Sequence, residues 1–167
     1  HKNKEGTPTM GGIAFIAASV ICGAGVAAYI ITKSGTASAA GFIATLLFAL
    51  VCGLIGVADD LAKFTKKENE GLTPQQKYLL QLVAAGAYLF TLVRAGLVTT
   101  EMNIPFAGIS VDLGIFYYVI CLLLLTGIVN SVNLTDGIDG LASGVTLVVG
   151  IFYAAVAAVS DMVAGTE

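Results

Sequence analysis

Five long apolar runs constrain the fold of this chain more than any other feature. The fourth is the shortest, and the five cover approximately residues 12–31, 39–58, 78–98, 113–129 and 141–159. Each is close to the ~20 residues that a helix needs to cross a bilayer. Only 11% of the residues are charged, whereas soluble domains carry about 25%. The pattern predicts an all-α polytopic membrane protein, a single membrane domain over residues 1–167, with about five transmembrane helices.

The lysines indicate which side of the membrane each connection faces. Five crossings place residues 1–11, 59–77 and 130–140 on one side, and these segments hold six of the eight Lys and Arg residues. Loops rich in Lys and Arg stay cytoplasmic, so we expect these three segments to be cytoplasmic. On the other side, residues 99–112 predict a short hairpin or an irregular cap, with Pro105 confined to an edge.

The stretch from Asn130 to Leu141 places unusual polarity between two apolar runs. Its carboxamides and carboxylates recur every three residues, at Asn130, Asn133, Asp136 and Asp139, with glycines at 137 and 140. Glycine lets the backbone approach a ligand closely. A polar loop in which Asp139 caps the next helix is the alternative. One cap does not require four such side chains, which favours a binding or catalytic site.

Asp59 and Asp60 close the second apolar run, and the helix is expected to continue past them toward Gly71. On that helix both acids lie one turn from Lys63, so ion pairs between them are expected. Paired carboxylates also suit Mg²⁺, which takes one or two of them together with substrate phosphates. The alternative is a solvated helix extension held by ion pairs alone. Thr73, Pro74 and Gln76 predict the start of the next helix, with an N-cap, a proline at N1 and a capping box.

A third polar cluster, residues 6–12, precedes the first apolar run. Thr9 is suited to capping the following helix, with the glycines easing its packing. The same loop could instead use its backbone N–H groups, together with Lys4, to hold a phosphate or a base at a helix N-terminus. Both interpretations can hold together.

The three clusters resemble, in order, the signatures of the phospho-N-acetylmuramoyl-pentapeptide transferase family, within the polyprenyl-phosphate N-acetylhexosamine-1-phosphate transferase superfamily. The matching segments read HKNKEGTPTMGG, GVADDLAKFTKKENEGLTPQQK and NSVNLTDGIDGLASG. The resemblance implies a Mg²⁺-dependent enzyme of the bacterial inner membrane with a cytoplasmic active site. It implies transfer of phospho-N-acetylmuramoyl-pentapeptide from its UDP carrier to undecaprenyl phosphate, giving lipid I and UMP in peptidoglycan synthesis.

The resemblance also implies roles for individual residues. Asp59 is similar to the family's proposed base toward the lipid phosphate, and Asp60 lies beside it; both are candidate metal ligands. Asp136 and Asp139 are similar to active-site acids. Candidate substrate-binding residues are Lys4, Thr9, Lys63, Lys67, Lys77, Asn130, Asn133, Leu134 and Gly137.

Two other functions stay open from the residues. Within the superfamily, a UDP-GlcNAc:undecaprenyl-phosphate GlcNAc-1-phosphate transferase is the nearest rival. From another class, a cation-binding membrane transporter subunit would place acids inside the spans, and these spans hold almost none. A net charge of −3 makes nucleic acid an unsuitable partner. The resemblance covers about half of the family's length, so we expect this chain alone to be inactive. Completing it would take a missing C-terminal half or a homodimer partner.

Overall fold

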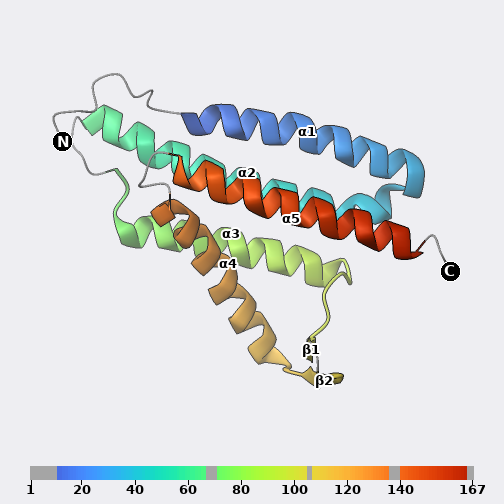
Figure 1. Cartoon of the computed structure of the whole chain (residues 1–167). Helices are drawn as coiled ribbons and strands as arrows, with labels where there is room; N and C mark the ends of the chain where they lie inside the picture. The colour runs from blue at the N-terminus through green and yellow to red at the C-terminus, as the bar shows by residue number, and fades with distance from the viewer. Residues whose placement is uncertain (1–10, 67–70, 105–106, 136–139, 165–167) are drawn as a thin grey trace. The chain divides into compact units, whose positions relative to one another are not determined.

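The structure is a computed structural model, and it describes residues 11–66, 71–104, 107–135 and 140–164 (Figure 1). The chain forms two compact units, His1–Thr126 and Gly127–Glu167. The first contains three helices, a β-hairpin and the beginning of a fourth helix. The second contains the end of that helix and a fifth helix.

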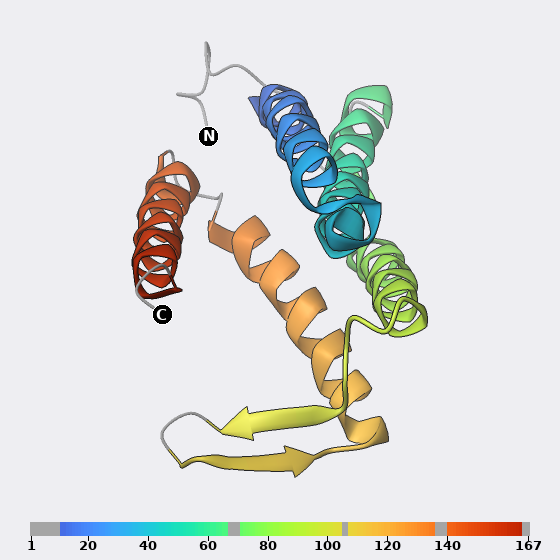
Figure 2. The same cartoon turned by 90° about the vertical axis from the view of Figure 1, so that its right-hand side faces the viewer.

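A helical hairpin opens the first unit. Helix α1, Gly11–Ser34, and helix α2, Thr36–Lys66, are joined at Gly35, which has a φ of 84°. Only glycine adopts this left-handed conformation without steric penalty, and its N–H donates to the Ile31 carbonyl at 3.0 Å, closing α1. The two helices run side by side in opposite directions (Figures 1 and 2).

Small residues allow α1 and α2 to approach closely. A Cβ added at Gly23 would lie 2.7 Å from methyl groups of Leu46, and one at Gly53 would lie 3.0 Å from Ile16. Close packing at small residues is the usual basis of helix association in membranes. The two glycines therefore allow α1 to pack closely against α2. This packing holds α2 in place, and α2 carries the polar residues at its C-terminal end.

Helix α3, Pro74–Arg94, packs along α2. The rings of Phe48 and Tyr88 stack with centroids 4.8 Å apart, and the Tyr88 hydroxyl is hydrogen-bonded to the Thr45 hydroxyl at 2.8 Å. The N-terminus of α3 confirms the sequence prediction in detail. Thr73 is the N-cap, Pro74 opens the helix, and Gln76 completes a capping box.

A two-stranded antiparallel hairpin follows α3, the first of the two forms, hairpin or irregular cap, that the sequence left open. Strand β1, Glu101–Ile104, pairs with β2, Ile109–Asp112, with Glu101 opposite Asp112 (Figure 2). The Asp112 carboxylate accepts from the Thr100 hydroxyl at 2.5 Å and from the Gly114 N–H at 2.9 Å. These hydrogen bonds lower the pKa of Asp112, and they fix the path of the chain into the next helix.

Helix α4 spans Ile115–Thr135 and helix α5 spans Leu141–Ala164. The boundary between the two units falls inside α4, after Thr126. The sequence analysis ended the fourth apolar run near residue 129 and assigned residues 130–140 to a connection, whereas the helix continues to Thr135. Residues 130–135 contain no glycine or proline, so nothing in them breaks the helix and it continues to Thr135.

Among the described residues, four helices are long and apolar enough to cross a membrane: α1, α2, α4 and α5. Between 0% and 11% of each apolar window is buried within the protein, which leaves their hydrophobic side chains for lipid or for further protein. This confirms the prediction of an all-α, multi-pass membrane protein. Helix α3 carries Lys77, Gln81 and Arg94 and is less apolar; its crossing stays a prediction.

Candidate active site

The described part of the candidate site is built on the C-terminal end of α2. This helix has 31 residues and is the longest of the described helices, as predicted. At that length it extends for about 46 Å, against roughly 30 Å for the hydrocarbon core. A helix this long can cross the bilayer and still carry Asp59 and Asp60 on rigid backbone at its end.

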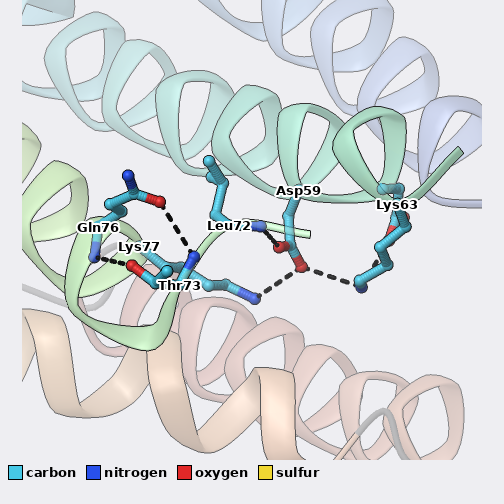
Figure 3. Close-up of polar contacts among 7 residues, drawn as sticks. Asp59, Lys63, Leu72, Thr73, Gln76 and Lys77 are labelled. Atoms are coloured by element: carbon cyan, nitrogen blue, oxygen red, sulfur yellow. Dashed lines mark hydrogen bonds and ion pairs between the residues drawn. The ribbon is translucent and has the colours of Figure 1, made fainter. Parts of the chain in front are cut away.

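Asp59 is the centre of a polar cluster (Figure 3). The residue is only 8% exposed, and both of its carboxylate oxygens have partners. Oδ2 pairs with Lys63 Nζ at 3.0 Å and with Lys77 Nζ at 3.5 Å, while Oδ1 accepts from the Leu72 backbone N–H at 2.9 Å. Lys63 comes from α2 and Lys77 from α3, so this one carboxylate joins the two helices.

The connection before α3 lies directly against Asp59. Gly71 is buried, and a Cβ added to it would clash with the Asp59 carbonyl oxygen and lie 2.6 Å from Oδ1. The sequence analysis treated Gly71 only as a stop signal for the preceding helix and missed this contact. Contacts between residues twelve or more positions apart leave no periodic signal in a sequence, so pattern analysis could not have found it.

Asp60 differs from its neighbour in both burial and pairing. Its side chain is 53% exposed, compared with 11% for that of Asp59. Its Oδ1 is 3.2 Å from Lys63 Nζ, so Lys63 bridges the two acids. The four side chains together comprise two carboxylates and two ammonium groups, and their formal charges cancel.

The fit of a divalent cation differs for the two acids. Within the ranges the structure describes, no group of three or more His, Cys, Asp or Glu side chains lies close enough together to hold a metal. Asp59 faces two cations with Oδ2 and a backbone donor with Oδ1. Asp60, more than half exposed, is the better placed of the two to offer an oxygen to Mg²⁺. Such a site suits an ion that takes one or two carboxylates and completes its shell with water and substrate phosphate.

The other predicted site residues fall in two groups. Asn130, Asn133 and Leu134 lie on the last turns of α4, in the unit Gly127–Glu167; the two asparagines share a helix face, and Leu134 is 80% exposed. The remaining predicted residues lie outside the described part of the chain: Lys4, Thr9, Lys67, Asp136, Gly137 and Asp139.

Comparison with known proteins gives the same family as the sequence motifs. The model of glycosyl transferase family 4 matches residues 42–166, and the phospho-N-acetylmuramoyl-pentapeptide-transferase signature 1 matches residues 4–16. These two matches include all three polar clusters.

Several curated relatives carry the name phospho-N-acetylmuramoyl-pentapeptide-transferase. One from Clostridium perfringens strain SM101 is 40% identical over 152 residues, covering 91% of this chain and 44% of the relative. One from Listeria monocytogenes strain EGD-e is 42% identical over 151 residues, covering 89% and 44%. One from Staphylococcus haemolyticus is 38% identical over 167 residues, covering 96% and 49%. The chain thus spans about half the length of these relatives, and it belongs to glycosyl transferase family 4.

Proposed function

We propose that this chain forms part of an enzyme that transfers phospho-N-acetylmuramoyl-pentapeptide from its UDP carrier to undecaprenyl phosphate. The products would be lipid I, a step toward peptidoglycan, and UMP. The names of the relatives support phospho-N-acetylmuramoyl-pentapeptide as the transferred group. The observation that carries the proposal is the cluster of two acids and two lysines, Asp59, Asp60, Lys63 and Lys77, at the end of a span-length helix.

The chemistry requires charge neutralisation more than covalent help. An oxygen of the lipid phosphate attacks the sugar-bearing phosphorus of the UDP-sugar, a new phosphoanhydride bond forms, and the old one breaks to release UMP. Negative charge is crowded at the reacting phosphates throughout. Ammonium groups held in position lower the energy of such a transition state. Lys63 and Lys77, fixed from two different helices, are suited to this role.

The contacts of Asp59 favour a positioning role for it over that of a base. A base must hold a lone pair toward the proton it removes, and Oδ2 of Asp59 is shared by Lys63 and Lys77. Two ammonium groups at this oxygen also lower the basicity of the carboxylate, which makes it a weaker base. In the arrangement observed, the carboxylate instead holds the two ammonium groups close together.

We further propose that Mg²⁺ is the cofactor, with Asp60 as the ligand from the described part of the chain and Asp59 as a weaker candidate. When bound, the ion would neutralise charge on the pyrophosphate of the UDP-sugar. Asp136 and Asp139 are proposed as further active-site acids, on the basis of their place in the NSVNLTDGIDG motif.

The proposed location is the bacterial inner membrane, with the site on the cytoplasmic face. The asymmetry of the lysines supports this orientation, since six of the eight Lys and Arg residues belong to the segments that carry the motifs. Both substrates would meet there, the nucleotide sugar from the cytosol and the lipid phosphate from the bilayer.

The test is Mg²⁺-dependent release of UMP by the full-length protein, given UDP-MurNAc-pentapeptide and undecaprenyl phosphate. We expect Asp59→Asn, Asp136→Asn and Asp139→Asn each to abolish or severely reduce turnover, because the isosteric amide keeps the shape and removes the charge. Ser38→Ala, far from the polar clusters in the sequence, is the control. Near wild-type turnover in all three variants would contradict the catalytic assignment.

Two rival functions predict different results. UMP release with UDP-GlcNAc but not with UDP-MurNAc-pentapeptide would identify a GlcNAc-1-phosphate transferase. Cation uptake into proteoliposomes without UMP release from either donor would identify a transporter subunit. The described acids argue against the transporter, because Asp59 and Asp60 lie near the end of α2 and not along a pathway through it.

A further inference from the structure

Gly71 occupies the most restricted glycine position in the first unit. Gly71 is buried against Asp59, and it is the glycine whose added Cβ would meet the nearest atoms among those the structure describes. Its φ lies outside the left-handed region, so the backbone conformation does not by itself require glycine there. The limit is steric: the space that a side chain would need is occupied by the backbone and the carboxylate of Asp59.

The neighbouring residues hold this connection from both ends. Leu72, next to Gly71, donates its N–H to Asp59 Oδ1 at 2.9 Å. Thr73 then caps α3: its hydroxyl accepts from the Gln76 N–H at 3.3 Å, and the Gln76 side chain accepts from the Thr73 N–H at 3.1 Å. Leu72 is thus held by α2 and Thr73 by α3 (Figure 3).

The position of Lys77 depends on this connection. It lies one turn into α3, and its ammonium reaches Asp59 Oδ2 across the gap between helices at 3.5 Å. Lys63 reaches the same oxygen from α2 at 3.0 Å. A displacement of the connection by the width of a methyl group would move the start of α3, and Lys77 with it, away from Asp59 and Lys63.

We propose that Gly71 is a positioning residue, which lets the chain lie against Asp59 so that the two lysines meet at a single carboxylate oxygen. This inference rests on the proposed function, since the lysines are the groups that would face the phosphates. A larger residue at position 71 should leave the helices formed but separate the charges. Misplacement of a catalytic constellation by about 1 Å can reduce the rate on the order of 100-fold.

The test compares Gly71→Ala with Gly86→Ala in the full-length protein. Gly86 lies within α3 and has no atom within 4 Å of an added Cβ, so its variant controls for the general effect of replacing glycine by alanine. We expect Gly71→Ala to reduce kcat about 100-fold with little change in KM for either substrate. The two lysines are proposed to stabilise the transition state, and loss of an interaction made only in the transition state lowers kcat without raising KM. Gly86→Ala should retain kcat within about twofold of the wild type, since alanine is a better helix former than glycine and the added methyl meets no neighbouring atom.

Hydrogen exchange at Leu72 provides a measurement that does not depend on the reaction. Gly71→Ala should speed exchange in peptides containing the Leu72 amide by about tenfold, as expected for loss of a hydrogen bond to a charged acceptor, while exchange in the middle of α2 stays unchanged. Asp59→Ala removes the same acceptor without altering position 71 and should give the same increase. If Gly71→Ala does not fold, unchanged Leu72 exchange in Asp59→Ala still overturns the proposal, because the connection is then not held by Asp59.

The outcomes separate this inference from the proposed function. If the wild type releases no UMP, the proposed function fails, and the exchange rates still decide whether Gly71 and Asp59 hold the connection. Wild-type kcat in Gly71→Ala, or unchanged Leu72 exchange in Asp59→Ala, would overturn the positioning role. A loss of kcat accompanied by faster exchange throughout α2 and α3 would also overturn it, since that pattern indicates general destabilisation.

Discussion

Replacing each of the two adjacent acids by asparagine should have very different effects on stability. Asp59 is 8% exposed and interacts with two ammonium groups and one backbone N–H. The side chain of Asp60 is 53% exposed and has one ion pair, at 3.2 Å. The two residues share a helix, a charge and a lysine, so each serves as the control for the other.

The magnitude follows from what each substitution leaves unpaired. Removing one partner of a fully buried ion pair costs about 3–5 kcal/mol. The loss at Asp59 is smaller, because neither lysine is fully buried: the side chain of Lys63 is 41% exposed and keeps Asp60, and that of Lys77 is 17% exposed. We therefore expect Asp59→Asn to lower the free energy of unfolding by about 2 kcal/mol. Asp59→Ala should cost about 1 kcal/mol more, because the Leu72 N–H then also loses its acceptor. Asp60→Asn should cost less than about 0.5 kcal/mol, as is usual for an exposed pair.

The assay is denaturant unfolding of the purified protein in detergent micelles, followed by circular dichroism. Raising the salt concentration should reduce the small effect of Asp60→Asn more than that of Asp59→Asn, since exposed charges are screened first. Equal losses for Asp59→Asn and Asp60→Asn would refute the argument, because it derives the difference entirely from burial and from the second lysine.

Two further predictions concern the hairpin and the path of α3. Thr100 and Gly114 donate to Asp112 and lower its pKa below 3.8, so these contacts stabilise the hairpin above that pH. The contribution should be lost as the pH falls through the lowered pKa, which NMR titration of the Gly114 amide would detect; a Gly114 amide shift that follows an unperturbed aspartate would contradict it. If α3 crosses the membrane, cysteines placed at Thr36 and Glu101 should be labelled from the same, non-cytoplasmic side. Labelling from opposite sides would show that α3 does not cross.

The sequence predicted best those features that arise within a few consecutive residues. Thr73, Pro74 and Gln76 predicted the start of α3 because a capping box involves residues only three positions apart. The pairing of Lys63 with both acids followed in the same way from helical spacing. The hairpin was expected from turn residues between two short segments, and the pairing of Glu101 with Asp112 confirms it.

Features that depend on distant residues could not be predicted in this way. The contact of Gly71 with Asp59 joins positions twelve residues apart through a connection whose path no local pattern specifies. The end of α4 was misplaced for a different reason. The apolar run ends where polar residues begin, at Asn130, but polar residues do not by themselves end a helix. Asparagine lowers helix propensity only modestly, and residues 130–135 include no glycine or proline.

The charge balance of the cluster has a consequence for any anion that binds there. Lys63 and Lys77 already face Asp59, and Lys63 also faces Asp60, so a phosphate would compete with these carboxylates for the same ammonium groups. Binding at the two lysines is therefore an exchange of partners, and its strength depends on how much interaction with Asp59 each lysine retains. Lys77 makes the longer contact with Asp59, 3.5 Å against 3.0 Å for Lys63. Of the two, Lys77 gives up the weaker ion pair with Asp59 in turning toward a phosphate, while Lys63 keeps the carboxylates of α2 in place.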